Sequence, residues 1–253
     1  MAERPAVGRP EVGRPEVERP ASPGRALVTG VSSGIGAAIA ARLLDDGWEV
    51  VGLSRTAPAT LPAIDHPALR FVAVDLMDAG ALANALAGLP PVRAVVHAAG
   101  ILRVGRLGET DSATADARAM WRLHVEAATQ LVEHAVPVME EGGRVVLIGS
   151  RTSDGSAGRG QYAASKAALS GLARSWAIEQ APRGVTVNIV APGATDTPML
   201  ADPNRAGVQP KRPPIGRFVK PEEVAALTAF LLSDAAASIT GQRIVVCGGA
   251  SLV

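Results

Sequence analysis

The sequence predicts an α/β fold in which helices cover both faces of a doubly wound parallel sheet. Short apolar segments typical of strands alternate with helical segments from residue 25 onward, and this alternation favours parallel strands joined by helical crossovers. The first apolar segment also runs into a glycine-rich turn that opens a helix, as expected at one end of such a sheet. With 253 residues, 47% of them hydrophobic, the chain is long enough to bury one large core.

The elements follow one another along a single domain, residues 25–253, with no sign of a second one. Strands are expected at residues 26–29, 48–53, 70–74, 94–98, 144–148, 185–190 and 243–246. Helices are expected at residues 34–45, 79–87, 162–180 and 221–232, and within residues 112–139. Prolines at positions 58, 62 and 67 lie between the second and third strands, so any crossover helix there is short or absent.

Residues 1–24 form a tail in front of this domain. Residues 3–22 repeat a five-residue unit that contains an Arg-Pro pair, and a proline in every unit blocks both helices and sheet ladders. We expect an extended or disordered, dispensable segment, with a docking arm as the alternative.

Composition argues against several classes of protein. The formal net charge is +1, and basic and acidic residues balance at 20 each outside residues 1–25, so we expect no nucleic-acid or membrane partner. No apolar run is long enough to span a bilayer, and the N-terminus lacks the apolar region of a signal peptide. The single cysteine, Cys247, excludes an internal disulfide and fits a reducing compartment, so we expect a cytoplasmic protein. We expect no bound metal.

The glycine turn runs from Thr29 to Gly36 and reads Thr-Gly-Val-Ser-Ser-Gly-Ile-Gly. Its three glycines allow the backbone to approach a pyrophosphate and allow the helix, whose N-terminus faces the phosphates, to pack closely on the strand. The spacing differs from the usual G-x-G-x-x-G fingerprint, and an ordinary strand-to-helix turn is the alternative for the glycines alone. The turn thus indicates a Rossmann-type dinucleotide site.

A phenol and an ammonium, Tyr162 and Lys166, are four residues apart and lie on one face of the expected helix. Tyrosine has an unperturbed pKa of about 10, and a nearby cation lowers the pKa of an acid by about 1–3 units. General acid–base catalysis works best when the catalytic pKa is near the working pH, so the pair suits proton transfer. Surface packing with a solvated amine is the alternative explanation.

These motifs resemble those of short-chain dehydrogenases/reductases and occur in that family's order from about residue 24 to residue 253. The matching segments are the glycine turn, Asp75-Leu-Met-Asp78, His97-Ala-Ala-Gly100, Ser150, Tyr162-x-x-x-Lys166, Pro192-Gly193, Thr197, and the C-terminal Ile239-Thr-Gly-Gln and Cys247-Gly-Gly segments. The resemblance implies an enzyme that transfers a hydride between a nicotinamide cofactor and a small secondary alcohol or ketone.

The resemblance also implies roles for individual residues. Tyr162 would be the acid/base, Lys166 would also bind the nicotinamide ribose, and Ser150 would hydrogen-bond the substrate oxygen. The implied catalytic set is Ser150, Tyr162, Lys166 and His124. The implied cofactor-binding set is Gly30, Ser32, Ser33, Gly34, Ile35, Gly36, Ser54, Arg55, Asp75, Leu76, Ala98, Ala99, Gly100, Tyr162, Lys166, Pro192, Gly193, Thr195 and Thr197, with Asp75 at the adenine and Thr197 at the carboxamide.

The end of the second strand predicts which nicotinamide cofactor binds. A carboxylate there would bind the ribose hydroxyls and repel a 2′-phosphate, but the position holds Ser54 and is followed by Arg55. Arginine pairs with phosphate through two parallel hydrogen bonds. We therefore expect NADP(H) to be favoured over NAD(H), with a solvated Arg55 as the alternative.

Two histidines depart from the family pattern. His124 occupies the place of an asparagine thought to act largely through its main-chain carbonyl, so catalysis is expected to survive the replacement. Its imidazole is either a proton-relay member or a tolerated replacement, and we favour the second reading. His97 likewise stands where the family has the first asparagine of the Asn-Ala-Gly strand end.

Residues 198–217 are the expected substrate lid, and Arg205, Lys211 and Arg212 there suit either an anionic substrate or solvent, with solvent the more common case. A 3-oxoacyl-[acyl-carrier-protein] reductase is the alternative enzyme, although Glu140 and Glu141 would repel an acidic carrier. A non-catalytic dinucleotide-binding sensor or scaffold is the alternative of another class. By family analogy we expect a homotetramer or homodimer.

Overall fold

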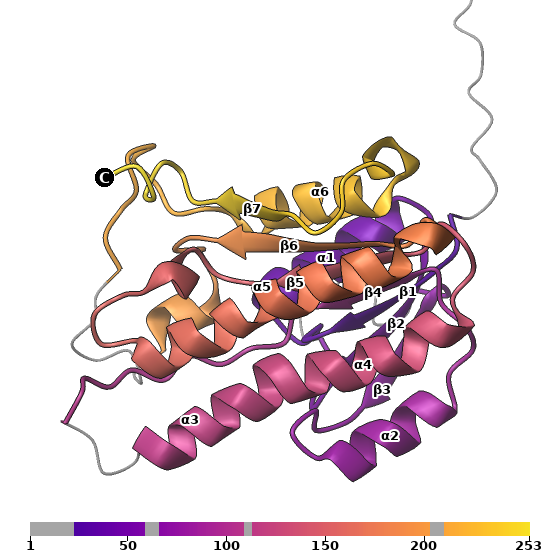
Figure 1. The fold of residues 1–253 in the computed structure, drawn as a ribbon, viewed down its shortest axis with the longest axis horizontal. Coiled ribbons are helices and arrows are strands. Elements are labelled where there is room, and N and C mark those ends of the chain that lie inside the picture. Colours follow the sequence, from indigo (N-terminus) through magenta and orange to yellow (C-terminus); the bar gives the residue numbers. More distant parts are fainter. Residues whose placement is uncertain (1–22, 59–65, 109–112, 203–209) are drawn as a thin grey trace, which may run out of the picture.

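The computed structural model describes residues 23–58, 66–108, 113–202 and 210–253, and the predicted tail at residues 1–22 lies outside them. Seven strands of this described part form one parallel sheet in the order β3-β2-β1-β4-β5-β6-β7. The strands are β1 Arg25–Thr29, β2 Glu49–Ser54, β3 Leu69–Ala73, β4 Ala94–His97, β5 Arg144–Ile148, β6 Thr186–Pro192 and β7 Arg243–Val246. This is the predicted doubly wound α/β domain, which is confirmed (Figure 1).

The helices agree with the sequence prediction to within a few residues at their ends. They are α1 Gly34–Asp45, α2 Ala79–Ala87, α3 Ala113–Trp121, α4 Ala127–Ala135, α5 Gly160–Gln180 and α6 Pro221–Leu232. The described residues between β2 and β3 contain no helix, as the prolines there predict. Within the described ranges, no helix combines the length and hydropathy needed to cross a bilayer.

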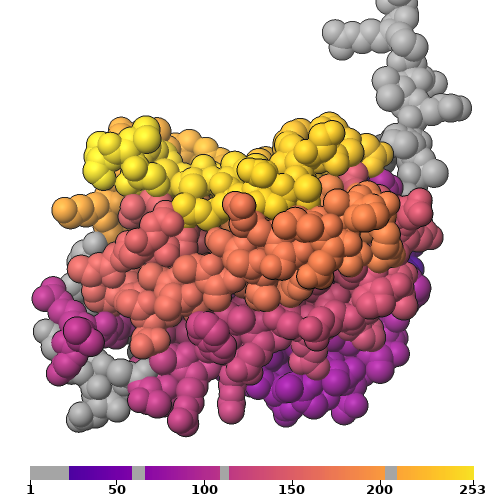
Figure 2. Space-filling view, viewed as in Figure 1, coloured from indigo at the N-terminus to yellow at the C-terminus, as the bar shows by residue number. Residues whose placement is uncertain are grey.

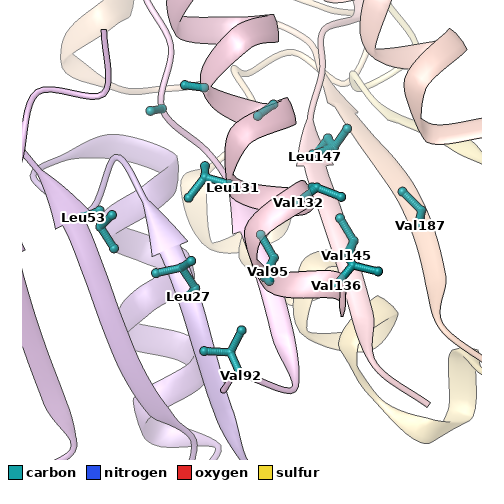
Figure 3. Close-up of a cluster of buried hydrophobic side chains, with 14 of the residues drawn as sticks. Leu27, Leu53, Val92, Val95, Leu131, Val132, Val136, Val145, Leu147 and Val187 are labelled. Atoms are coloured by element: carbon teal, nitrogen blue, oxygen red, sulfur yellow. The ribbon is translucent and has the colours of Figure 1, made fainter. Parts of the chain in front are cut away.

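The sheet separates two apolar layers because successive side chains of a strand point to opposite faces. In β1, Leu27 joins the layer under α2, α4 and α5, whereas Val28 joins the layer under α1 and α6. Figure 3 shows the first layer, in which Leu131 and Val132 of α4 lie against Val95 of β4 and neighbouring strands. Figure 2 shows α5 and the run from α3 to α4 covering that face as a continuous surface.

The long helical run predicted at residues 112–139 is interrupted by a π turn. α3 passes into a π-helical segment at Arg122–Glu126 and then into α4, before a short 3-10 turn at Val136–Val138. Such π segments inside α-helices are frequent at functional sites. Here the π turn buries Leu123 and His124 at the point where the run passes the end of β4.

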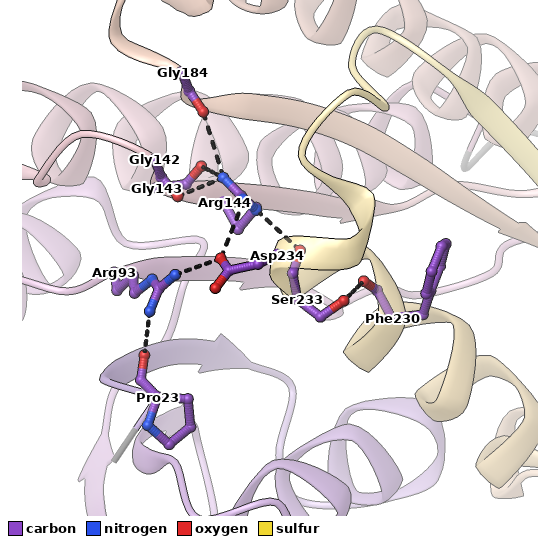
Figure 4. Close-up of polar contacts among 9 residues, drawn as sticks. All are labelled: Pro23, Arg93, Gly142, Gly143, Arg144, Gly184, Phe230, Ser233 and Asp234. Atoms are coloured by element: carbon purple, nitrogen blue, oxygen red, sulfur yellow. Dashed lines mark hydrogen bonds and ion pairs between the residues drawn. The ribbon is translucent and has the colours of Figure 1, made fainter. Parts of the chain in front are cut away.

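The buried arginine Arg144 stabilises the amino-terminal end of β5 (Figure 4). The guanidinium of Arg144 donates to the carbonyls of Gly143 at 3.1 Å and Gly184 at 3.4 Å. It also donates to the carbonyl of Ser233 at 3.4 Å and lies 3.6 Å from the carboxylate of Asp234. This edge of the sheet is opposite the strand ends that carry the site, so Arg144 stabilises the framework.

Candidate active site

A cleft of about 440 Å³ opens where β4, β5 and β6 end. Parallel α/β sheets bind ligands at these carboxyl ends because the loops that follow the strands meet there. The predicted residues that line the cleft are Ile35, Ala98, Gly100, Ser150, Tyr162, Lys166, Pro192, Gly193, Thr195 and Thr197. The structure therefore brings together residues that are far apart in the sequence.

The glycine turn lies beside this cleft and needs its glycines for close approach. Gly30 has a φ of +74°, and a Cβ there would lie 2.8 Å from Ala99, while a Cβ on Gly36 would lie 2.2 Å from the carbonyl oxygen of Gly30. A Cβ on Gly34 would lie 3.2 Å from Thr197. Ser33 precedes α1 without forming a side-chain capping bond, which leaves the start of α1 open to an anion.

These features fit a dinucleotide. The close-packed turn and the N-terminus of α1 suit the phosphates, and Ile35, Ala98 and Thr197 extend the surface into the cleft. At the end of β2, Ser54 is buried and donates to the carbonyl oxygen of Thr56 at 2.8 Å, and Arg55 is exposed. These two residues, with Ser32, Asp75 and Leu76, lie outside the cleft lining, at the ends of β1, β2 and β3.

Lys166 lines the cleft but is largely buried, with 4% of its surface exposed. Its Nζ donates to the carbonyl oxygen of Ile148 at 2.8 Å, and burial lowers the pKa of Lys166 to about 7. Tyr162 is partly buried one helical turn earlier on α5 and lines the same cleft. The pair expected from the i, i+4 spacing is therefore directed into one cavity.

Ser150 follows the end of β5 and lines the same cleft as Tyr162 and Lys166. Its Oγ accepts a hydrogen bond from the backbone N–H of Thr152 at 3.2 Å and shares another with the Thr152 hydroxyl at 3.0 Å. These two bonds fix the serine side chain. A fixed hydroxyl suits stabilisation of charge that develops on a substrate oxygen.

His124 lies beneath the cleft and forms hydrogen bonds through both ring nitrogens. Nε2 accepts from the backbone N–H of Ile101 at 3.1 Å, so the proton is on Nδ1, which donates to the Ser165 hydroxyl at 2.9 Å. Ser165 in turn donates to the carbonyl oxygen of Tyr162 at 2.9 Å. Burial, and then the charge of Lys166, hold the pKa of His124 well below its usual value, so the ring is neutral.

His97 is the second neutral imidazole of this buried layer. Its Nε2 donates to the carbonyl oxygen of Leu123 in the π turn at 2.9 Å, and its Nδ1 accepts from the Thr29 hydroxyl at 3.0 Å. The Thr29 oxygen accepts from the backbone N–H groups of Ala98 and Ala99 at 3.1 and 3.2 Å. Burial, with a further contribution from the charge of Lys166, lowers the pKa of His97 to about 3.

Sequence reasoning missed several members of this network. Thr29, Leu123 and Ser165 were not predicted as site residues, and His97 was noted only as a departure from a family pattern. A polar residue at the end of an apolar strand is a weak signal for Thr29, and no comparable signal marks Ser165. Their partners are set by the strand order and by the π turn, which the sequence does not display locally.

Two of the four cationic side chains at the rim of the cleft, Arg151 and Arg159, were also missed. Arg151 and Arg159 line it, from the loop that joins β5 to α5, together with Lys211 and Arg212 of the expected lid. Arg205 lies outside the described residues. Among the residues that the structure covers, no group of three or more potential metal ligands occurs.

Comparison with known proteins agrees with this architecture. A family model described as enoyl-(acyl carrier protein) reductase matches residues 30–251. The 3-oxoacyl-[acyl-carrier-protein] reductase of Escherichia coli is 34% identical over 90% of this chain and 97% of its own length. The cis-4-hydroxycyclohexanecarboxylate dehydrogenase of Sinomonas cyclohexanicum is 36% identical over 90% of this chain and 96% of its own, and bovine (Bos taurus) L-xylulose reductase is 34% identical over 89% and 95%.

Solved structures show the same fold. A protein described as a short chain dehydrogenase/reductase family protein superposes with a TM-score of 0.82 at 35% identity, over 90% of this chain and 97% of its own. A blue fluorescent protein from a metagenomic library, solved in complex with NADPH, gives a TM-score of 0.78 at 31% identity, over 89% and 97%. With its sheet order, glycine turn and Tyr-x-x-x-Lys pair, this chain is an oxidoreductase that belongs to the short-chain dehydrogenase/reductase family.

Proposed function

We propose that this chain catalyses the NADP(H)-dependent interconversion of a small secondary alcohol and its ketone. The observation that carries the proposal is the convergence of Ser150, Tyr162 and Lys166 on one cleft beside the glycine turn. A reduced nicotinamide, when bound, would supply the hydride for this reaction. The residues of the chain then have to orient the carbonyl and provide a proton.

Tyr162 is the proposed proton donor in reduction and the proton acceptor in alcohol oxidation. Its Oη would give a proton to the carbonyl oxygen during reduction, and the Ser150 hydroxyl would donate a hydrogen bond to that oxygen. The Lys166 ammonium beside Tyr162 stabilises the phenolate. Because burial lowers the pKa of Lys166 to about 7, the amine is close to its titration point in the ligand-free protein, and negative charge nearby would favour its protonation.

NADP(H) is the proposed cofactor because the end of β2 presents Ser54 and the exposed Arg55 in place of a carboxylate. Ser54→Asp places a negative charge where a 2′-phosphate would bind. We expect this variant to lower the ratio of kcat/KM with NADPH to that with NADH by about tenfold or more. Steady-state kinetics with both cofactors measure the ratio. An unchanged ratio would show that position 54 does not determine the cofactor preference.

A 3-oxoacyl-[acyl-carrier-protein] reductase is the second candidate, favoured by the 34% identity to the E. coli enzyme. Docking an acidic carrier needs exposed basic groups, but the Arg144 guanidinium is buried. The guanidinium of Arg183 donates to the carbonyl oxygens of Val136 and Met139, while Glu140 is exposed. At this edge of the sheet the basic groups are therefore bound within the protein, which supports a free small molecule over a carrier-bound substrate.

The experiment is NADPH oxidation with a panel of small ketones, and with acetoacetyl-acyl carrier protein as a separate arm. Turnover of free ketones with little turnover of the carrier substrate supports the proposal. Efficient turnover of the carrier substrate alone would assign the second candidate. Tight NADPH binding without turnover in either arm would contradict catalysis and favour a sensor or scaffold.

We also propose a homo-oligomer. Large apolar side chains are exposed on the helices of one face, including Trp121 at 44% and Ile178 at 76%. Mass measurement in solution tests this, with a dimer or tetramer expected, and a monomer at micromolar concentration would contradict it.

A further inference from the structure

The cleft is lined by four basic side chains besides Lys166 and by no aspartate or glutamate side chain among the described residues, although the terminal residue Val253 also lines it. Arg151 and Arg159 belong to the loop between β5 and α5, and Lys211 and Arg212 belong to the expected lid at residues 198–217. Several like charges around a concave site with apolar walls focus the electric field into that site. The described rim of this cleft therefore attracts anions.

Several arginines elsewhere on the molecule pair with carboxylates. Arg42 pairs with Asp46 at 2.8 Å, and Arg243 pairs with Asp154 at 2.7 Å. Arg217, five residues beyond Arg212, pairs with Glu223 at 2.8 Å. In contrast, no described carboxylate lies within the 4.0 Å ion-pair distance of Arg151, Lys211 or Arg212.

The two arginines also flank the proposed reacting groups. Arg151 directly follows Ser150, and Arg159 comes three residues before Tyr162, with both arginines partly buried. One guanidinium N–H of Arg151 donates to the carbonyl oxygen of Ala250 at 3.2 Å, which limits the positions open to that side chain. A molecule whose carbonyl lies at Ser150 and Tyr162 would therefore have guanidinium groups within the same cavity.

Cofactor phosphates are a second source of negative charge, but their expected place is separate. The phosphates are expected at the glycine turn and the N-terminus of α1, where Gly34 lies beside Thr197, and Arg55 does not line the cleft. Guanidinium groups pair with carboxylates through parallel hydrogen bonds, and this gives direction as well as attraction. We propose that the substrate is a small keto or hydroxy acid whose carboxylate binds to Arg151 and Arg159. This inference rests on the proposed alcohol–ketone function.

The test compares two ketones that differ only in charge, 4-oxocyclohexanecarboxylate and its methyl ester, with NADPH as the reductant. We expect kcat/KM to be at least about tenfold higher for the acid, the effect of one charge-assisted hydrogen bond. Arg151→Gln and Arg159→Gln should each lower the acid-to-ester ratio by about tenfold. Arg174→Gln is the matched control, because Arg174 is exposed on α5 and does not line the cleft. It should leave the ratio at the wild-type value.

A direct binding measurement separates this inference from the proposed function. Calorimetric titration with unreactive cyclohexanecarboxylate, with NADP⁺ present, should show binding that the double variant Arg151→Gln/Arg159→Gln weakens by tenfold or more. Equal turnover of acid and ester by an active enzyme would overturn the carboxylate site and leave the proposed function intact. If neither ketone is reduced, the binding measurement still decides the inference. The inference is overturned if wild type binds no cyclohexanecarboxylate, or if the double variant binds it as tightly as wild type.

Discussion

The buried layer beneath the cleft and the rim around the cleft differ in how their polar groups are partnered. Beneath the cleft, His97 and His124 are fully buried and neutral, and each ring forms a hydrogen bond through both nitrogens. At the rim, Arg151 and Arg212 remain charged and partly or fully exposed, with no described carboxylate at ion-pair distance. The comparison indicates that the buried layer holds the residues of the site in position, whereas the charges of the rim are available to interact with a ligand.

The largest predicted effect concerns the pH dependence of the buried layer. The pKa of His97 is about 3 in the folded protein and 6.5 when the group is unperturbed, so the unfolded chain binds more protons between these values. The free energy of unfolding therefore falls as pH decreases from 6.5 toward 3, by about 3–5 kcal/mol from this residue. Urea unfolding over this range should show a shallower decline for His97→Asn. A parallel decline in both proteins would contradict a buried neutral His97.

The next effect concerns the bridge formed by His124. His124→Leu leaves the N–H of Ile101 and the Ser165 hydroxyl without their imidazole partner, which should cost about 1–3 kcal/mol in stability. The same change should lower kcat because Ser165 also bonds the backbone of Tyr162. In His124→Asn the carboxamide also offers an acceptor and a donor, so it should recover much of the stability and kcat. Equal kcat in the Leu and Asn variants would show that the bridge does not position the site.

The smallest effect belongs to the exposed part of the rim. Lys211 is exposed, so Lys211→Gln should lower kcat/KM for an anionic ketone by only about two- to fivefold, equivalent to about 0.4–1 kcal/mol. Added salt should reduce the difference between variant and wild type, because ions screen exposed charges. Kinetics at low and high potassium chloride measure both quantities. A difference that grows with added salt would contradict an electrostatic role for the rim.

The same comparison explains what the sequence could predict. The alternation of strands and helices depends on local patterns of apolar residues, and the predicted parallel α/β fold is confirmed. The helix that carries Tyr162 and Lys166 lies where the same patterns predict it. The bond from Thr29 to His97 joins residues 68 positions apart and depends on the pairing of β1 with β4. The π turn that presents Leu123 to His97 has no local sequence signal. The rim arginines are in loops, whose courses depend on tertiary packing.

The central claim is that the cleft reduces a ketone with Tyr162 as the proton donor. The most direct measurement compares wild type with Tyr162→Phe in single-turnover NADPH oxidation, using a ketone that the wild-type enzyme reduces, alongside NADPH affinity from fluorescence titration. The account predicts that the variant binds NADPH with affinity close to wild type but reduces the ketone about 10²–10⁴-fold more slowly. Reduction at the wild-type rate by Tyr162→Phe would contradict the account.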